Sequence, residues 1–392
     1  MTTAERISRW ARRFVFAGAL WLAVWQILVL AGGTHRTGVV VGLLGFVFQT
    51  VFGKAYSLVP SYFDRSLVTT RLLPVHFLLG NLGPMLLAVG IETANPSLRL
   101  AGAVAWTLAV GVFVGTLGAS IRDNIAGSET GTGDASSHRV PLDRTANPFV
   151  PVAFAYLLVG TYGLLAVESE LPVLVDGYVP RTVHLLGAGG AVLLLFAVGF
   201  RLLPRFLVTT IDHRFALVVL TAGALGPAVI AVSLPAGGLF AVGAALQAVA
   251  VVGYALAVVA LYRRSKRDRI GFYGVLGGAG AGLLAVGLGI TFALDGVTGA
   301  RIAAHARLNV LGLLGLTIVG VSYQFYPPGV STTALINDRT ALVALCLLAG
   351  GLVVEVTGLL AGLPLIRTLG RALAAIGGVA HLLVVAAVLA ER

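Results

Sequence analysis

The chain has 392 residues, of which 58% are hydrophobic and 11% are charged. This composition excludes an ordinary soluble protein, because only lipid can cover so much apolar surface. The formal net charge is +11, which brings nucleic-acid binding into consideration. The one cysteine, Cys346, excludes an internal disulfide and a thiolate metal cluster within one chain.

Apolar stretches of about 20 residues, the length of helix that crosses a bilayer, recur along the whole chain. Backbone groups in lipid must be paired within their own segment, and alternating ten-residue strands are absent, so the sequence predicts an all-α membrane protein. The first stretch is too long for a signal peptide, and we expect it to be retained as a helix. The twelve predicted transmembrane helices are 10–32, 37–59, 67–91, 97–120, 149–168, 180–203, 207–233, 237–262, 270–294, 301–326, 340–362 and 367–390.

Most connections between these helices are short, which predicts a single twelve-helix domain over residues 1–392. The exception is the segment 121–148, which is rich in Gly, Ser and Asp. This composition is typical of loops, so we expect a flexible polar loop on the cytoplasmic side.

The basic residues are distributed unevenly between the two ends of the predicted helices. If both termini are cytoplasmic, 20 of the 27 Lys and Arg residues lie on the cytoplasmic side. This asymmetry follows the positive-inside rule and explains the basic charge without nucleic acid. The sequence therefore predicts a multi-pass protein of the cell membrane with its N- and C-termini inside. The seven outer residues are Arg36, Arg99, Arg181, Arg301, Arg307, Arg367 and Arg371.

The second, sixth and tenth helices share one pattern, in which small residues lie fifteen and seven positions before a proline. Each also carries a histidine near its predicted outer end. The following helices keep the same period, since Gly226-Pro227 repeats Gly83-Pro84 after 143 residues. We therefore expect three four-helix units, at about 1–120, 149–262 and 270–392, in a pseudo-threefold arrangement. The marked positions are His35, Gly45, Gly53 and Pro60; His184, Gly189, Ala197 and Pro204; and His305, Gly312, Gly320 and Pro327.

The tenth helix, HARLNVLGLLGLTIVGVSYQFYP, resembles the pattern H-x-H-x4-G-x7-G-x2-Y-x3-P of the catalytic subunit I of heme–copper oxidases. The closest branches are the oxidases with b-type hemes and the nitric oxide reductases; twelve-helix proteins of the NnrS type are also similar. By this resemblance, His305 is the ligand of the high-spin heme. Arg307 replaces the ligand of the low-spin heme, and its protonated guanidinium has no lone pair for iron.

The resemblance also implies roles on three other helices. His35 matches the second ligand of the low-spin heme, and His184 matches the first ligand of copper. In the seventh helix, Gly226-Pro227 is followed by Ala228 and Val229, where the family has two histidines that bind copper. Neither side chain can coordinate a metal, so the copper centre is not expected here.

These residues lead to a hypothesis of function. The chain is expected to be an oxidase-like membrane protein without copper, which binds at most one b-type heme through His305 and His35. It would serve electron transfer, oxygen or nitric oxide handling, or sensing, with respiratory subunits or a small electron carrier as partners. Arg307 could pair with a heme propionate.

Two alternatives remain open. One is a transporter or channel, and the other is a cofactor-free assembly partner of a respiratory complex. Glu355 and His381 are ionisable residues within predicted helices, and they could form a proton relay or a buried hydrogen-bonded pair. His76, near the end of the third helix, is expected to contact lipid headgroups.

Overall fold

The computed structural model describes residues 2–235 and 238–391. The predicted limits at residues 1, 237 and 392 therefore lie outside the described residues. The first half of the chain contains α1 (Thr3–Leu30), α2 (His35–Val39), η1 (Val40–Val47), α3 (Phe48–Tyr62), α4 (Leu73–Glu92), α5 (Pro96–Ile121), η2 (Arg122–Asn124), η3 (Asp134–Arg139), α6 (Val140–Ala146), α7 (Phe149–Val167), α8 (Val179–His184), η4 (Leu185–Val192) and α9 (Leu193–Leu207). The second half contains α10 (His213–Ser233), α11 (Gly238–Arg264), α12 (Ile270–Asp295), α13 (Gly299–Arg307), η5 (Leu308–Leu316), α14 (Thr317–Phe325), η6 (Pro328–Val330), α15 (Asp338–Leu360) and α16 (Pro364–Ala390).

Twelve helices in the described part of the chain are long and apolar enough to cross a bilayer. The prediction of an all-α, multi-pass membrane protein is therefore confirmed. Three of these twelve contain a π-helical stretch, since α2, η1 and α3 form one continuous helix, as do α8, η4 and α9, and α13, η5 and α14.

Two predicted helix starts differ from the structure for local reasons. The first helix begins at Thr3 rather than residue 10, because Thr2 and Glu5 exchange hydrogen bonds in a capping box. The third begins at Leu73 rather than residue 67, because Pro74 occupies the first turn, where its missing N–H costs nothing.

The prediction of a flexible loop over 121–148 is wrong for the second part of that segment. Residues Val140–Ala146 form α6, and the side chain of Asp143 is completely buried. A polar residue can be buried when a partner of opposite charge is buried with it. Here Arg201 and Arg205 of α9 pair with Asp143.

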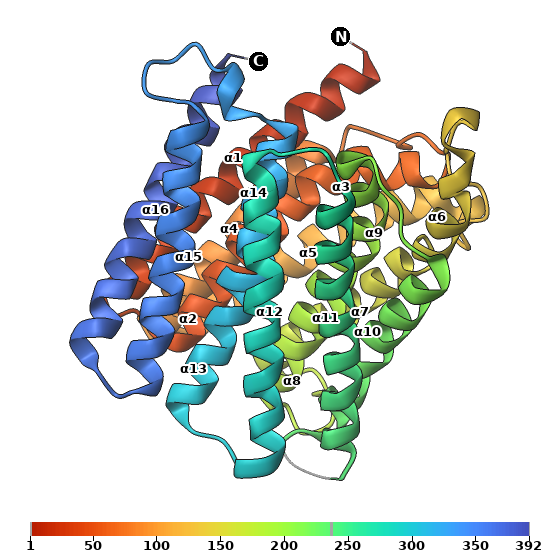
Figure 1. The fold of residues 1–392 in the computed structure, drawn as a ribbon. Helices are drawn as coiled ribbons and strands as arrows, with labels where there is room; N and C mark the ends of the chain where they lie inside the picture. Colours follow the sequence, from red (N-terminus) through yellow and green to blue (C-terminus); the bar gives the residue numbers. More distant parts are fainter. Residues whose placement is uncertain (1, 236–237, 392) are drawn as a thin grey trace. The chain divides into compact units, whose positions relative to one another are not determined.

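The described residues form two compact units, residues 2–14 with 51–265 and residues 15–50 with 266–391. In the first unit, α4 packs against α5, and α10 packs against α11. In the second unit, α15 and α16 form a tight antiparallel hairpin, drawn in blue in Figure 1. The prediction of a single domain stays a prediction.

Small residues allow the helices of the second unit to approach closely. A Cβ atom on Gly320 of α14 would overlap the carbonyl oxygen of Gly271 on α12, and one on Gly312 would overlap Ala281. In the hairpin, a Cβ on Gly370 would overlap the backbone of Glu355. The close contacts bring backbone against backbone, which is how membrane helices pack without a hydrophobic driving force.

Three π-helical segments interrupt longer helices, at Val40–Val47, Leu185–Val192 and Leu308–Leu316. Long π segments are rare, and short ones often accompany functional sites. Each begins 19 or 20 residues before the proline of its helix, at Pro60, Pro204 or Pro327. The helices with the repeated sequence pattern are therefore also the helices with the repeated distortion.

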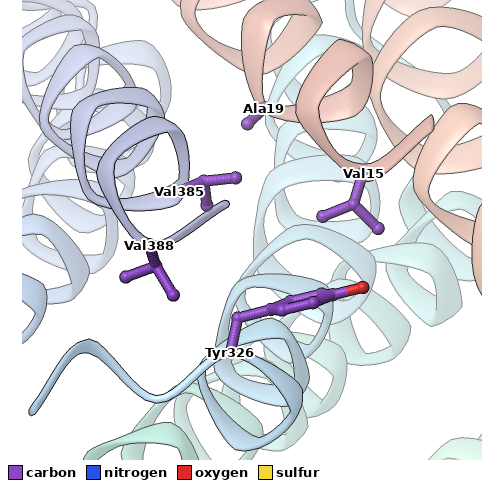
Figure 2. Close-up of a cluster of buried hydrophobic side chains, with 5 residues drawn as sticks. All are labelled: Val15, Ala19, Tyr326, Val385 and Val388. Atoms are coloured by element: carbon purple, nitrogen blue, oxygen red, sulfur yellow. The ribbon is translucent and has the colours of Figure 1, made fainter. Parts of the chain in front are cut away.

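A small apolar cluster closes the second unit at one end. Tyr326, at the end of α14, packs with Val15 and Ala19 of α1 and with Val385 and Val388 of α16, as Figure 2 shows. Through this cluster, α1 contacts α14 and α16, whose residues lie more than 300 positions later in the sequence.

Replacing Gly320 by alanine should lower the free energy of unfolding by about 1–3 kcal/mol, because the added methyl group must push α14 away from α12. The measurement is thermal unfolding of the purified protein in detergent. Gly280→Ala on α12 is the matched control, since its Cβ meets open space and should leave stability unchanged or slightly higher. Equal effects of the two substitutions would contradict this packing.

Candidate functional site

The second unit contains a cavity of about 110 Å³. It lies between α1, α2, α13, α15 and α16, and all of its lining residues belong to this unit. Its polar lining comes from six of these residues: Trp25, Thr34, His35, Arg307, Glu355 and Arg371. We refer to this space as the Arg307 cavity. Charged residues inside apolar helices are expensive, so a cluster of them around a cavity is a candidate functional site.

Glu355 holds two arginines at the wall of this cavity. The Arg307 Nε donates to Glu355 Oε2 at 2.8 Å, and the Arg371 Nε donates to Glu355 Oε1 at 3.1 Å. Arg307 and Glu355 are both buried, whereas Arg371 is partly exposed. The cluster therefore contains two positive charges and one negative charge.

Arg307 is fixed by two further contacts to α1. Its Nη2 donates to the side-chain oxygen of Gln26 at 2.7 Å, and its guanidinium lies over the Trp25 ring, 4.7 Å from the centroid. Such stacking adds a favourable cation–π interaction to the ion pair. Arginine suits this place better than lysine, because its planar fork can stack and donate in several directions at once.

Three buried nitrogen donors around Arg307 have no hydrogen-bond partner within the described structure: Arg307 Nη1, Trp25 Nε1 and Gln26 Nε2. Buried donors are nearly always satisfied, so a cluster of three unsatisfied ones requires an explanation. Arg307 and Trp25 line the cavity, so a bound acceptor there would account for their two donors.

The structure brings together two of the residues singled out in the sequence. His35 and Arg307, for which the resemblance implies the two ligand positions of the low-spin heme, line the same cavity. His305 instead faces α12, where its Nδ1 donates to the carbonyl oxygen of Ala285 at 3.0 Å and its ring packs against Phe292. The two histidines therefore have different surroundings, as expected for positions 305 and 307, about 200° apart on a helix.

The Arg307 cavity does not fit a low-spin heme. Its volume is smaller than the about 150 Å³ of a cavity that accommodates benzene, and far below the about 300–1,000 Å³ of pockets for larger ligands. The Trp25 ring also packs directly against the backbone of Gly42 in η1. With a cationic Arg307 in place of a ligand, neither the space nor the donor set matches a heme.

His184 lies in the first unit, at the end of α8. Its Nδ1 donates to the carbonyl oxygen of Pro180 at 2.8 Å, which places the proton on Nδ1 and the lone pair on Nε2. Three residues earlier, Arg181 donates to Asp176 in the preceding loop, and this hydrogen bond lowers the pKa of the Asp176 carboxyl to about 2. Among the residues that the structure describes, no three His, Cys, Asp or Glu side chains gather as a metal site.

The proposed relay residues have different partners in the structure. Glu355 pairs with Arg307 and Arg371, whereas the Nδ1 of His381 lies 3.0 Å from the hydroxyl of Tyr323. His381 is buried on α16, and Tyr323 is buried on α14. Each group thus belongs to its own hydrogen-bonded set.

His76 was expected to contact lipid headgroups, and this expectation is wrong. Its side chain is completely buried, its Nδ1 lies 2.7 Å from the hydroxyl of Tyr56, and aromatic rings that include Phe52 and Phe113 surround it. Position along a helix predicts depth in the membrane but does not predict which side of the helix a residue occupies.

Sequence analysis missed Trp25, Gln26 and Arg371 as members of the site. A signal for Arg371 was present, because a carboxylate within a membrane helix needs a cation, and Arg371 lies in the helix after the one that carries Glu355. A weaker signal marks Gln26, because a polar side chain within an apolar helix needs a hydrogen-bond partner, and none marks Trp25.

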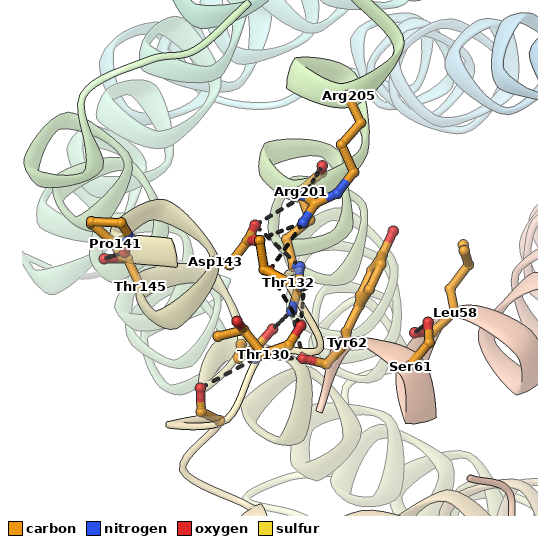
Figure 3. A network of polar contacts seen from close by, with 12 residues as sticks. Leu58, Ser61, Tyr62, Thr130, Thr132, Pro141, Asp143, Thr145, Arg201 and Arg205 are labelled. Atoms are coloured by element: carbon orange, nitrogen blue, oxygen red, sulfur yellow. Dashed lines mark hydrogen bonds and ion pairs between the residues drawn. The ribbon is translucent and has the colours of Figure 1, made fainter. Parts of the chain in front are cut away.

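A second buried charged network lies in the first unit. Figure 3 shows Arg201 and Arg205 of α9 around the carboxylate of Asp143 from α6. Arg201 also donates to the backbone carbonyls of Tyr62 and Thr130. This network fastens the segment 121–148 to α9 and explains why that segment is ordered.

Comparison of the chain with protein-family models finds no matching family, and comparison with curated proteins finds no similar sequence. The interpretation of function therefore depends on the chemistry of the site itself.

Replacing Asp143 by asparagine should lower the free energy of unfolding by about 3–5 kcal/mol, because Arg201 would keep a buried charge without its counter-ion. The measurement is chemical or thermal unfolding in detergent. Asp134→Asn, at an exposed position of the same segment, should have little effect. A stable Asp143→Asn protein would show that the network does not hold the segment in place.

Proposed function

We propose that the protein is a solute-binding membrane protein of the transporter class, with the Arg307 cavity as its substrate site. The observation that carries the proposal is the cluster of Arg307, Glu355 and Arg371 around a cavity inside membrane-spanning helices. Ionisable residues in such positions commonly mark the path of an ion or a substrate.

The scaffold that we propose is similar to the catalytic subunit of the heme–copper oxidase superfamily. The three π segments in register with Pro60, Pro204 and Pro327 support a pseudo-threefold arrangement of four-helix units. His35 and Arg307 also line one cavity, and this supports the similarity, because the resemblance assigns both positions to the ligands of one heme. Repeats of this kind place substrate sites near the interfaces of the repeated elements.

A location for the cavity in the membrane can be inferred from the charge distribution. The cavity lies near the C-terminal end of α1 and the N-terminal end of α2. With both termini in the cytoplasm, as the positive-inside rule indicates, this end faces outward. The site would then take up its solute from the outer side.

Filling the cavity with an apolar side chain should remove most of the transport and leave the charge of the cavity unchanged. Proteoliposomes with the protein should take up at least one of formate, nitrate, ammonium or glycine faster than protein-free vesicles. Gly38→Leu should remove most of this excess flux, because Gly38 lines the cavity and a Cβ there meets Trp25 Nε1 only at 3.6 Å. The measurement is solute uptake recorded over time.

Gly111→Leu is the matched control, since its Cβ meets open space on the exposed side of α5. It should transport as the unmodified protein does. Excess flux for none of the four solutes, or equal flux in Gly38→Leu and Gly111→Leu, would contradict the transport function.

A second candidate function is that of a heme protein with one b-type heme on His305. The supporting observation is the hydrogen bond from His305 Nδ1 to the carbonyl of Ala285, because metal-binding histidines usually donate their other nitrogen in this way. Such a heme would supply gas binding or one-electron transfer. It would link the protein to an electron carrier or to respiratory subunits.

An absorption spectrum of the purified protein, oxidised and dithionite-reduced, tests this second candidate. A b-type spectrum that disappears in His305→Ala, but persists in His138→Ala, would support it. His138 is the control because it lies in the polar segment 134–139. We expect instead a protein without a Soret band, and a band that depends on His305 would overturn that expectation.

A further inference from the structure

We infer that the Arg307 cavity binds one small monovalent anion, of the size of formate, nitrite, nitrate or chloride. This inference rests on the proposed function and names the class of its substrate. It depends on three properties of the cavity: its charge, its unpaired donors and its volume.

The charge of the cluster favours an anion. Arg307 and Arg371 carry two positive charges, and Glu355 carries the only negative charge among the residues that line the cavity. The other polar residues of the lining, Thr34, His35 and Trp25, add no carboxylate, and neither does Gln26, which bonds to Arg307. One monovalent anion would neutralise the remaining charge, which is costly to leave uncompensated in a membrane.

The directions of the donors favour the same ligand. Arg307 uses Nε and Nη2 for Glu355 and Gln26, and its Nη1 is left over. The indole N–H of Trp25 is also left over, beside Gly38 at the cavity wall. A guanidinium edge and an indole N–H from two residues of one cavity wall match an acceptor with negative charge.

The network in the first unit shows what a purely structural cluster of the same charges looks like. Asp143 also holds two arginines there, but the remaining donors of Arg201 end on backbone carbonyls of Tyr62 and Thr130 and on the side chain of Asn147. The Nε of Arg201 makes no hydrogen bond, but it lies 3.3 Å from Asp143 Oδ1 as an ion pair. In the Arg307 cluster, Arg307 Nη1 and Trp25 Nε1 have no hydrogen-bond partner within the described structure, and both residues line a cavity.

The volume sets the size of the ligand. The cavity of about 110 Å³ is smaller than the cavity of about 150 Å³ that accommodates benzene, so an anion of one to four heavy atoms fits. A large organic anion such as gluconate does not. The ligand is therefore distinguished from larger carboxylates by size alone.

Salt-specific stabilisation of the complete protein in detergent tests the inference. The protein is held at constant ionic strength in sodium gluconate, which is then replaced stepwise by formate, nitrite, nitrate or chloride. The unfolding temperature should rise with the concentration of at least one small anion, as a ligand that binds only the folded state requires. Isothermal titration with the same anion should give the dissociation constant.

Trp25→Phe is the decisive variant, because it keeps the ring under Arg307 and removes only the indole N–H. The dissociation constant should increase about tenfold, as expected for one lost hydrogen bond to a charged group. Trp106→Phe is the matched control, since the indole of Trp106 already donates to Thr161 and lies in the first unit. Its dissociation constant should be unchanged.

Three outcomes would overturn the inference. The first is an equal response to gluconate and to all small anions, which would mean that water alone satisfies the donors. The second is an unchanged dissociation constant in Trp25→Phe. The third is a purified protein with heme that Arg307→Lys releases, which would make the cavity a propionate site.

The two proposals can fail separately. Anion binding that weakens in Trp25→Phe, without solute flux in proteoliposomes, would support the anion site and overturn the transport function. Flux of ammonium or glycine that Gly38→Leu abolishes, without any response to anions, would support transport and overturn the anion site.

Discussion

A charge inside a membrane-spanning helix must be paired, and in the second unit this requirement is met by Glu355. Its carboxylate pairs with Arg307 from α13 and Arg371 from α16, and Arg307 in turn reaches Gln26 on α1. Four helices are thereby bound to one another through side chains that could not be exposed to lipid. Apolar packing alone would not specify which faces meet, because lipid chains compete equally for such faces.

The backbone makes this pairing possible. Arg371 reaches Glu355 because Gly370 allows α16 to touch the backbone of α15 at that level, and Gly351 and Gly358 continue the same contact. A larger residue at position 370 would separate the helices by the width of a side chain. The glycines therefore determine the geometry of the ion pairs as well as the density of packing.

The sequence predicts the helices well and their mutual contacts less well. Long runs of Leu, Val and Ala predict the twelve helices. The resemblance assigns related roles to His35 in α2 and Arg307 in α13, and both residues line one cavity. Pairs such as His381 with Tyr323 were not predictable. The π segment η5 lies between Arg307 and Tyr323, and it rotates α14 relative to a regular helix, so a periodicity of 3.6 residues fails across it.

The segment 121–148 shows a second limit of sequence reasoning. Its Gly, Ser and Asp residues are typical of a loop, yet Asp143 is as completely buried as Glu355. Burial in both cases is decided by arginines on other helices, Arg201 and Arg205 for Asp143, and Arg307 and Arg371 for Glu355. Composition describes a segment alone and cannot include a partner that only the fold supplies.

The exchange of histidine for arginine at a single position changes what a site can bind. A neutral imidazole offers a lone pair to a metal cation, whereas a guanidinium offers only protons and therefore attracts an anion. The resemblance implies a ligand of a metal cation at position 307, whereas an arginine there favours an anion. Because this arginine lies within membrane-spanning helices, it needs a negative partner. Glu355 neutralises one arginine and Arg371 restores the positive balance, so the cluster is stable enough to fold and still attracts one negative charge. If the proposed resemblance and the proposed anion site are both correct, this one difference would let such a scaffold bind an anion where the family binds a metal centre.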